Sequence, residues 1–426
     1  MKIYLETLGC RLNQAEIESM ARQFRAAGHE IVASAQGADL AVMNTCAVTN
    51  DAASDSRRVL RGLAKAGAKE IIATGCWATL QPQEAANLPN ILRIVPNRQK
   101  DALVERLKVE GLKLKVEPSA LHLQPATLNP QLRRRTRAFV KAQDGCDNRC
   151  AFCVTTVARG AARSSPLANV VADIQFALNG GAKEIVLTGV HLGSWGQEFN
   201  LHLRDLVKAL LRETDTPRLR LSSLEPWDLD ADFFSLWADA RLAPHLHLPL
   251  QSGCASTLKR MARKTTPDLF RELVASARAV IPDVAITTDL IAGFPAETEA
   301  EFAESLAFVE EINFAGGHVF TFSPRPATGA ANMRGQINPK LRKMRNHILR
   351  KALDESAKSY REKFIGRTLS ALWESASALG ASGWQMEGWT ENYLRVKALA
   401  SASRWNELDK TRLIEVDGEI LKGEIV

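Results

Sequence analysis

Three cysteines lie close together in the middle of the chain, at Cys146, Cys150 and Cys153. Their C-x3-C-x2-C spacing brings three thiolates into one short loop, where they repel one another and oxidise easily unless a cation or a cluster neutralises them. A structural zinc site usually has four ligands, and no fourth ligand lies next to this triplet. Zinc binding and simple packing remain as alternatives, but the spacing favours an iron–sulfur cluster.

A 4Fe-4S cluster held by three cysteines leaves one iron without a protein ligand. That iron can bind the amino and carboxylate groups of S-adenosylmethionine, and an electron from the cluster can then cleave the sulfonium to give a carbon radical. The loop therefore predicts radical chemistry. A protein that only carries electrons gains nothing from an open iron.

The chain has 426 residues, of which 46% are hydrophobic. This length and composition indicate a globular protein of two or three domains. No run of 18 apolar residues exists, and the start of the chain lacks the apolar core of a secretory signal, so we expect a soluble cytoplasmic protein without membrane contact. Seven cysteines, an odd number, favour reduced thiols over a disulfide framework.

Positive charge is concentrated in two places. The net charge is only +7, but ten basic and three acidic residues lie between Pro339 and Arg367. A second basic cluster contains Arg133, Arg134, Arg135 and Arg137. Such clusters attract polyanions, and nucleic acid is the first candidate. A solvated helix face and a basic linker would explain the same pattern.

The first hundred residues alternate short apolar runs with helical stretches. This pattern predicts βαβ units and a mostly parallel sheet. The expected strands are residues 3–8, 39–44 and 70–74, and the expected helices are residues 13–27, 50–66 and 82–87.

Cys10, Cys46 and Cys76 each follow one of these strands. Loops at the carboxyl ends of parallel strands share one edge of the sheet, so the three cysteines are expected to converge there. They would form a second three-thiolate site. Ordinary buried cysteines in a sheet are the alternative explanation.

The prolines and arginines of residues 112–136 indicate a linker, and a longer βαβ series follows it. Six strands with helices between them predict a partial (β/α) barrel, with the cysteine loop at the carboxyl end of the first strand. The expected strands are residues 137–141, 184–189, 218–223, 245–249, 284–290 and 317–321.

A long helix is expected from residue 339 to about 364, with Leu341, Met344, Ile348 and Ala352 on one face. Beyond Gly366, short runs of β-forming residues separated by glycines predict a small β-barrel, an architecture that often grips single-stranded RNA. A β cap without a function of its own is the alternative.

Ordered motifs run along essentially the whole chain. The amino-terminal motifs are Thr7-Leu8-Gly9-Cys10, Asn44-Thr45-Cys46-Ala47-Val48-Thr49-Asn50 and Thr74-Gly75-Cys76. Later motifs are Gln143-Asp144-Gly145-Cys146, Leu187-Thr188-Gly189-Val190-His191, Leu221-Ser222-Ser223-Leu224-Glu225-Pro226, His247-Leu248-Pro249-Leu250-Gln251-Ser252-Gly253, Gly293-Phe294-Pro295 and Ser323-Pro324-Arg325-Pro326. With these motifs the sequence resembles the methylthiotransferase family of radical S-adenosylmethionine enzymes.

The resemblance implies an α/β fold in three domains. Residues 1–115 would form the amino-terminal domain with an auxiliary cluster, and residues 116–136 a linker. Residues 137–362 would form the radical barrel, and residues 363–426 an RNA-binding β-barrel of the TRAM type. The implied cofactors are two 4Fe-4S clusters and S-adenosylmethionine. Cys10, Cys46 and Cys76 match the auxiliary ligands, and Cys146, Cys150 and Cys153 match the catalytic ones.

The implied reaction is methylthiolation of carbon 2 of an adenine. One S-adenosylmethionine methylates a sulfur held at the auxiliary cluster, and another supplies the radical that removes hydrogen from the carbon. The amino-terminal motifs and Ala158-Arg159-Gly160 look most like the branch that modifies N6-threonylcarbamoyladenosine beside the anticodon of tRNA. The implied partners are tRNA and a reducing electron donor, with no DNA.

Three other functions remain as alternatives. Related enzymes act on isopentenyladenosine in tRNA or on a ribosomal-protein aspartate. A non-catalytic iron–sulfur protein that binds RNA or carries electrons is the alternative from another class.

Other polar residues are candidates for binding. Glu225 and Gln251 are expected to contact S-adenosylmethionine, with a hydrogen-bonded barrel residue as the alternative for each. Asp289 is expected to be structural, and His191 to cap a strand end. Arg159 and Arg163 would meet a phosphate or the substrate's carboxylate, or form solvated salt bridges. Cys254 is expected to be a free thiol, not a ligand.

Overall fold

A computed structural model describes residues 1–109, 136–380 and 383–426. Of the predicted linker of residues 116–136, only Thr136 lies within the described residues. The described chain divides into two compact units. The first contains residues 1–109, 143–163 and 323–331, and the second contains the described parts of 129–142, 164–322 and 332–426. None of the helices described is both long and apolar enough to span a lipid bilayer.

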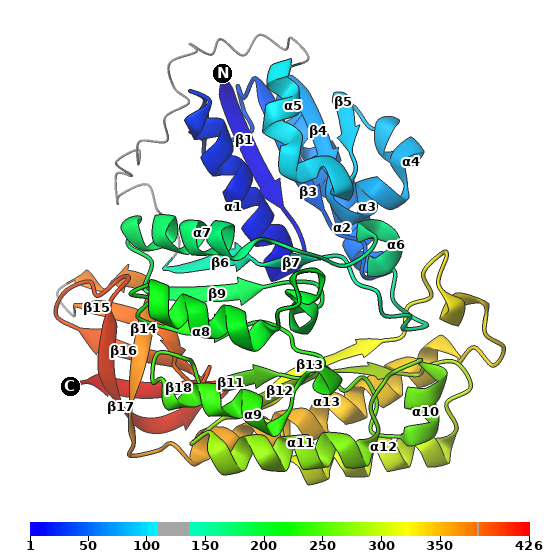
Figure 1. The fold of residues 1–426 in the computed structure, drawn as a ribbon, viewed down its shortest axis with the longest axis vertical. Helices are drawn as coiled ribbons and strands as arrows, with labels where there is room; N and C mark the ends of the chain where they lie inside the picture. The colour runs from blue at the N-terminus through cyan, green and yellow to red at the C-terminus, as the bar shows by residue number, and fades with distance from the viewer. Residues whose placement is uncertain (110–135, 381–382) are drawn as a thin grey trace. The chain divides into compact units, whose positions relative to one another are not determined.

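The first unit contains a parallel sheet of five strands in the order β2-β1-β3-β4-β5 (Figure 1). Its strands are β1 (Lys2–Thr7), β2 (Glu30–Val32), β3 (Leu40–Thr45), β4 (Glu70–Thr74) and β5 (Ile91–Val95). Its helices are α1 (Arg11–Ala26), α2 (Asn50–Lys65), α3 (Gly75–Leu80), α4 (Pro82–Ala86), α5 (Leu103–Val109) and α6 (Thr155–Arg159).

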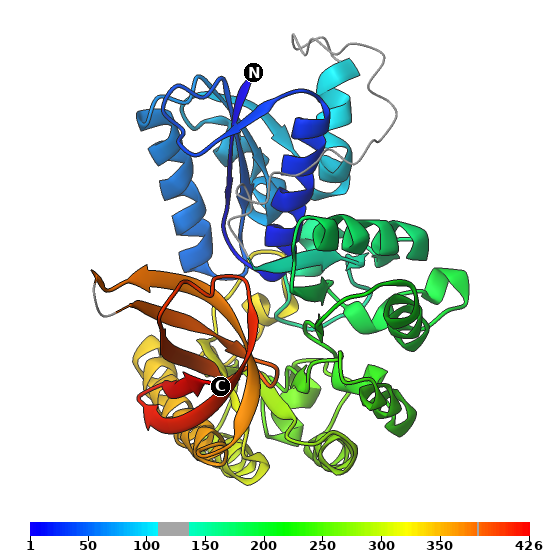
Figure 2. The ribbon, with the colours of Figure 1, turned by 90° about the vertical axis from the view of Figure 1, so that its left-hand side faces the viewer.

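Both faces of this sheet are buried. In β3, Ala41 and Met43 pack with Leu60 and other residues of α2, whereas Leu40 and Val42 pack with residues of α1 and α5. Figure 2 shows α1 and α2 on opposite sides of the sheet. Strands buried on both faces read as continuous apolar runs, which is why β3 and β4 were predictable.

The second unit contains a parallel sheet that curves into a partial barrel, as predicted. Its six strands are β6 (Arg137–Lys141), β9 (Glu184–Thr188), β10 (Leu219–Leu221), β11 (His245–His247), β12 (Ala285–Ala292) and β13 (Gly316–Thr321). They pair as β6-β9-β10 and β11-β12-β13, and bridges from Leu219 to Leu242 and from Ser223 to His247 connect the two halves. The short strands β7 (Gln143–Asp144) and β8 (Arg163–Ser164) flank the cysteine loop in sequence, and β7 belongs to the first unit.

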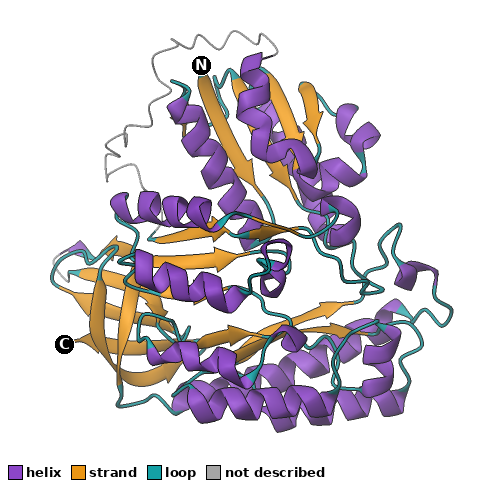
Figure 3. Cartoon of the chain, viewed as in Figure 1, coloured by secondary structure: helices purple, strands orange, loops and turns teal. Residues whose placement is uncertain are grey.

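Helices cover the outside of the curved sheet (Figure 3). They are α7 (Leu167–Asn179), α8 (Leu203–Glu213), α9 (Ala231–Phe234), α10 (Ala255–Arg260), α11 (Pro267–Val280), α12 (Glu299–Ile312) and α13 (Pro339–Glu362). Their apolar faces and the strands share one core that includes Leu187, Leu246 and Phe270.

The long helix α13 forms nearly where it was predicted, and its predicted apolar face is only partly buried, since Ala352 lies in the core and Ile348 packs against it. Met344 is 49% exposed, whereas Arg345, Leu349 and Leu353 are buried. The buried face is rotated because the Arg345 guanidinium pairs with Glu297 at 2.8 Å inside the fold. An apolar pattern alone does not reveal a buried arginine.

The chain ends in a closed five-stranded barrel in the order β14-β15-β16-β18-β17. Its strands are β14 (Thr368–Ala378), β15 (Trp384–Thr390), β16 (Arg395–Ala400), β17 (Leu408–Asp417) and β18 (Ile420–Ile425). Trp373, Met386, Val396 and Leu413 fill its core. The predicted α/β fold class, with a small carboxyl-terminal β-barrel, is confirmed.

Candidate active site

Cys10, Cys46 and Cys76 follow β1, β3 and β4, which are neighbours in the sheet. A methyl group added at Gly9 would lie 2.7 Å from the Cys46 Sγ, so the first two loops touch. Burial, with smaller contributions from the neighbouring Cys76 and Cys10, raises the pKa of the Cys46 thiol to about 11. The structure therefore brings these three cysteines together at one sheet edge, with Cys10 exposed and the other two buried.

Hydrogen bonds hold the backbone around these cysteines. The Ser56 hydroxyl in α2 accepts from the Cys46 N–H and donates to the Cys46 carbonyl, both at 3.0 Å. Gly75 has φ +91°, and a Cβ there would lie 2.4 Å from the Thr45 backbone. Glycine is required at this position because only it allows so close an approach of two chains.

Cys146, Cys150 and Cys153 lie between β7 and α6, and all three are partly exposed. The loop folds on itself, since the Cys153 N–H donates to the Cys150 carbonyl and the Cys146 N–H to the Gly160 carbonyl, each at 3.0 Å. Partial burial raises the pKa of the Cys153 thiol, and the nearby Cys146 adds to the effect. The Ala151 carbonyl accepts from the Ala330 N–H at 2.8 Å, which holds the segment 323–331 against the loop.

Within the described part of the chain, no three His, Cys, Asp or Glu side chains are arranged to hold a single metal ion. The two cysteine sets nevertheless suit an iron–sulfur group chemically. Each set offers three reduced thiols, and thiolate sulfur is the usual ligand of such clusters.

Glu225 and Gln251 lie in the second unit, after β10 and β11. The Glu225 carboxylate accepts two hydrogen bonds from the Arg263 guanidinium, at 2.7 and 3.1 Å. Arg263 also lies 4.5 Å above the Trp227 ring. Gln251 has a left-handed φ of +74°, and its backbone bridges to β12 through Asp289 and Ile291. Glu225 is thus held in one orientation, and Arg263, which the sequence analysis missed, orients it.

Nearby polar side chains fit a cofactor with several donors and acceptors. Ser222 Oγ and Asp289 Oδ1 are buried without a hydrogen-bond partner among the described residues. Buried polar atoms usually have partners, so these two are places where a bound molecule would complete the bonding. His191 Nε2 lies 2.6 Å from Asp228 Oδ2, so this histidine joins two loops.

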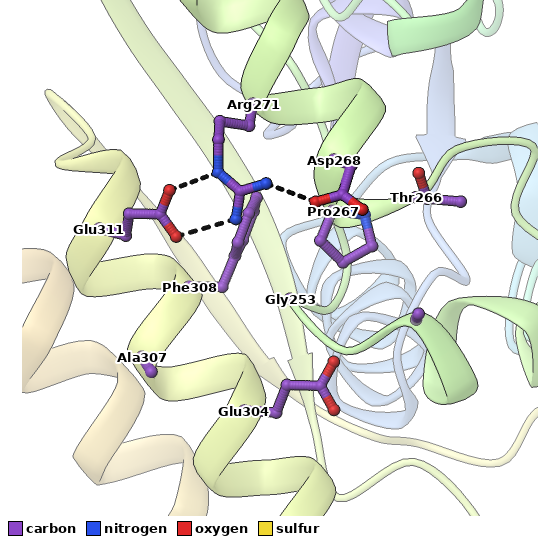
Figure 4. A pocket seen from close by; sticks show the side chains of 10 residues that line it. Gly253, Thr266, Pro267, Asp268, Arg271, Glu304, Ala307, Phe308 and Glu311 are labelled. Carbon is purple, nitrogen blue, oxygen red and sulfur yellow. Dashed lines mark hydrogen bonds and ion pairs between the residues drawn. The ribbon is translucent and has the colours of Figure 1, made fainter.

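A groove in the second unit lies between α11 and α12 and is also lined by Gly253 and Ala255. Figure 4 shows Arg271 of α11 paired with Asp268 of the same helix and with Glu311 of α12. The same groove includes Phe308 and Glu304. Because its only cation is already paired with two carboxylates, the groove is no candidate for the reaction.

Arg159 and Arg163 both form salt bridges, and only that of Arg163 is partly open to solvent. Arg159 is buried, with 1% of its surface exposed, and forms salt bridges to Glu16 and Asp144. The expectation of a solvated salt bridge is therefore wrong for Arg159. Arg163 pairs with Asp144 at 2.6 Å and keeps 39% of its side chain exposed. The sequence analysis also missed Glu16 and Lys100, which join this buried group.

The chain is similar to known proteins along essentially its whole length. Residues 2–95 match the model of the uncharacterized protein family UPF0004, and residues 140–309 match that of the Radical SAM superfamily. The threonylcarbamoyladenosine tRNA methylthiotransferase of Thermotoga maritima is 32% identical, over 99% of this chain and 98% of its own. The tRNA-2-methylthio-N(6)-dimethylallyladenosine synthase of Erythrobacter litoralis is 30% identical, over 99% and 96%.

Among solved structures, the chain is similar to the radical S-adenosylmethionine methyltransferase TsrM from Kitasatospora setae. The TM-score is 0.57 at 14% identity, covering 77% of this chain and 76% of that one. At this identity the likeness concerns the fold alone.

Proposed function

The chain belongs to the radical S-adenosylmethionine methylthiotransferase family, and we propose that it transfers a methylthio group to carbon 2 of N6-threonylcarbamoyladenosine in tRNA, next to the anticodon. The observation that carries the proposal is the pair of three-cysteine sets in one compact unit. Two such sets are what a reaction needs when it both generates a radical and delivers sulfur.

The cofactors proposed are two 4Fe-4S clusters and S-adenosylmethionine. Cys146, Cys150 and Cys153 would hold the cluster that cleaves S-adenosylmethionine, and Cys10, Cys46 and Cys76 would hold the auxiliary one. When bound, these groups supply the electron, the carbon radical and the sulfur that an unactivated aromatic C–H bond requires. Reduced thiols of this kind suit a cytoplasmic location, and a cytoplasmic reductant would supply the electrons.

The chain's own residues hold the reacting groups in place. Ser56 and Gly75 fix the backbone beside Cys46 and Cys76, and Arg263 orients Glu225. Glu225 and Gln251 are proposed to bind S-adenosylmethionine from loops after β10 and β11. Residues 1–115, 137–362 and 363–426 are proposed as the functional domains, with RNA binding assigned to the last.

The threonylcarbamoyl substrate is favoured by the names of the relatives. Relatives from Thermotoga maritima and Bacillus subtilis that carry this name are each 32% identical to the chain. The named dimethylallyladenosine enzyme at 30% identity makes that nucleoside the second candidate.

Mass spectrometry of nucleosides tests the substrate. tRNA from a strain without this gene should lose the methylthio form of threonylcarbamoyladenosine and regain it when the gene is restored. Loss of only the isopentenyl derivative, or of the mass increment on a ribosomal protein, would assign the chain to another branch. An unchanged nucleoside profile and proteome would favour a non-catalytic role.

Iron analysis tests the cofactors. Anaerobically reconstituted protein should hold about eight irons, as two four-iron clusters require. A variant with Cys10, Cys46 and Cys76 replaced by alanine should hold about four. Equal iron in the two proteins would overturn the assignment of the auxiliary ligands.

A further inference from the structure

A buried group of charged side chains connects the two cysteine sets inside the first unit. Its centre is Glu16 on α1, which is 2% exposed. The Glu16 carboxylate accepts from Lys100 Nζ at 2.5 Å, from Arg159 Nη1 at 2.8 Å and from Asn44 Nδ2 at 3.1 Å. Glu16 and Arg159 are 143 residues apart in sequence, so their pairing joins distant segments.

Arg159 is the last residue of α6, the helix that follows the Cys146–Cys153 loop. Its guanidinium donates to Glu16, to Asp144 Oδ1 at 2.9 Å and to Asn13 Oδ1 at 2.7 Å. Asp144 precedes the loop, so Arg159 closes the base of the loop while it binds α1. Burial by itself lowers the pKa of Arg159, but Glu16, Cys76 and Asp144 together raise it well above its ordinary value.

Two asparagines extend the group to the amino-terminal cysteines. Asn13 Nδ2 donates to the carbonyls of Leu8 and Thr45, at 2.6 and 3.1 Å, on the loops that carry Cys10 and Cys46. Asn97 Nδ2 donates to the Ala158 carbonyl at 2.9 Å and lies 3.7 Å from Cys76 Sγ. Each of the three amino-terminal cysteine loops is therefore bonded to a residue that also contacts Arg159 or its neighbour.

Stability alone does not explain so many buried charges. Removing a charge from water costs several kcal/mol, and well-packed apolar residues of similar volume often stabilise a core as well or better. What a buried ion pair adds is directional specificity, because each guanidinium–carboxylate bond holds only in one geometry. The buried charged group around Glu16 is therefore suited to fixing the position of the cysteine loop relative to α1.

We propose that Arg159 is a positioning residue that, through Glu16 and Asn13, holds the Cys146–Cys153 loop at a fixed position relative to Cys10, Cys46 and Cys76. This positioning couples cleavage of S-adenosylmethionine to transfer of the methylthio group. The coupling rests on the proposed function, whereas the fixed position of the loop is a property of the fold.

Hydrogen–deuterium exchange on the reconstituted full-length protein tests the position of the loop. Arg159→Gln and Glu16→Gln should each raise exchange in peptides from residues 143–163 by about tenfold, because both remove the charge-assisted bond that ties the loop to α1. Arg159→Lys, which keeps the charge but loses the fork of donors, should give a smaller rise. Arg58→Gln is the matched control, since Arg58 pairs with Asp55 on the exposed face of α2.

Peptides from α2 serve as the internal reference for these variants. Increased exchange in 143–163 with unchanged exchange in α2 supports the proposal. Equal exchange in Arg159→Gln and Arg58→Gln would overturn it. An equal rise in α2 and the loop would also overturn it, because the group would then stabilise the unit as a whole.

Product ratios test the coupling. With iron content equal to that of the wild type, Arg159→Gln should form about tenfold more deoxyadenosine for each methylthio group transferred. An unchanged ratio would overturn the coupling. If the wild-type protein modifies no tRNA, the proposed function fails, and the exchange result still decides whether Arg159 positions the loop.

Discussion

Cys150 occupies the centre of the loop that is proposed to generate the radical. Cys150→Ala should abolish reductive cleavage of S-adenosylmethionine, because a cluster with only two protein thiolates is not held. The variant should keep about four irons at the other cysteine set. Deoxyadenosine formed by anaerobic protein measures the cleavage, and persistent formation would show that the loop has another role. Cys254→Ala is the control, since Cys254 is buried and bonded to Glu304.

Gly145 shapes the same loop through its backbone. Its φ is +71°, and a Cβ there would lie 1.9 Å from the Ala161 carbonyl oxygen. Gly145→Ala should therefore lower the free energy of unfolding by about 3 kcal/mol and reduce iron uptake, since the backbone must move. Gly67 has φ +92° with open space around it, so Gly67→Ala should cost only about 1 kcal/mol. Thermal denaturation and iron analysis distinguish the two variants. Equal losses of stability and iron in both would contradict the steric argument.

The grouping of the cysteines was predictable from the sequence, but the side chains that hold their loops in place were not. Spacing shows that Cys146, Cys150 and Cys153 share a loop, and the strand pattern places Cys10, Cys46 and Cys76 at one edge. Glu16 reads as an ordinary polar residue of a helix, because its partner Arg159 comes 143 residues later. A buried ion pair between distant segments leaves no periodic signal in either segment.

At the scale of elements, long apolar runs were predicted and short or polar elements were missed. β2 has three residues and α3 has six, so neither extends far enough to show a period. In α13 the buried Arg345 was missed and Met344 was placed with the apolar face although it is exposed, whereas Ala352 of that face is buried. The partial barrel was predictable because its strands and helices alternate regularly along the chain.

The contact between the central sheet and the carboxyl-terminal barrel depends on a buried carboxylate. Glu184 on β9 accepts from Arg220 at 2.7 Å and from Arg218 at 3.3 Å. Arg218 also donates to the Ser370 carbonyl of β14 at 2.9 Å. Burial raises the pKa of Glu184, but Arg220 and then Arg218 and Arg137 outweigh it and lower the pKa to about 2.

This lowered pKa makes the second unit sensitive to acid. Because the folded pKa lies below the ordinary value of about 4.3, the ionised Glu184 stabilises the fold above pH 4.3 by about 3 kcal/mol. That stability is lost as the pH falls toward 2. Denaturant unfolding at pH 7 and pH 3 should show a smaller pH dependence in Glu184→Gln than in the wild type. An identical dependence would mean that other groups control acid unfolding.

For the whole molecule, the proposed function requires a surface that binds tRNA, and the carboxyl-terminal barrel is the proposed one. Lys410, Arg412 and Ile414 alternate with the buried Thr411 and Leu413, so β17 presents two cations and an apolar side chain on its outer face. Such a stripe suits a phosphate backbone with an adjacent base.

Replacing both Lys410 and Arg412 by alanine should weaken tRNA binding by about tenfold at moderate salt, because two phosphate contacts are lost. The slope of log affinity against log salt should fall by about 1.4, the value expected for two contacts to single-stranded RNA. Lys422→Ala is the matched control, since Lys422 lies on the same barrel but pairs with Glu415. Filter binding across a salt series measures both quantities. Equal slopes for the double variant and the wild type would place the tRNA on another surface, with the basic helix α13 as the next to be tested.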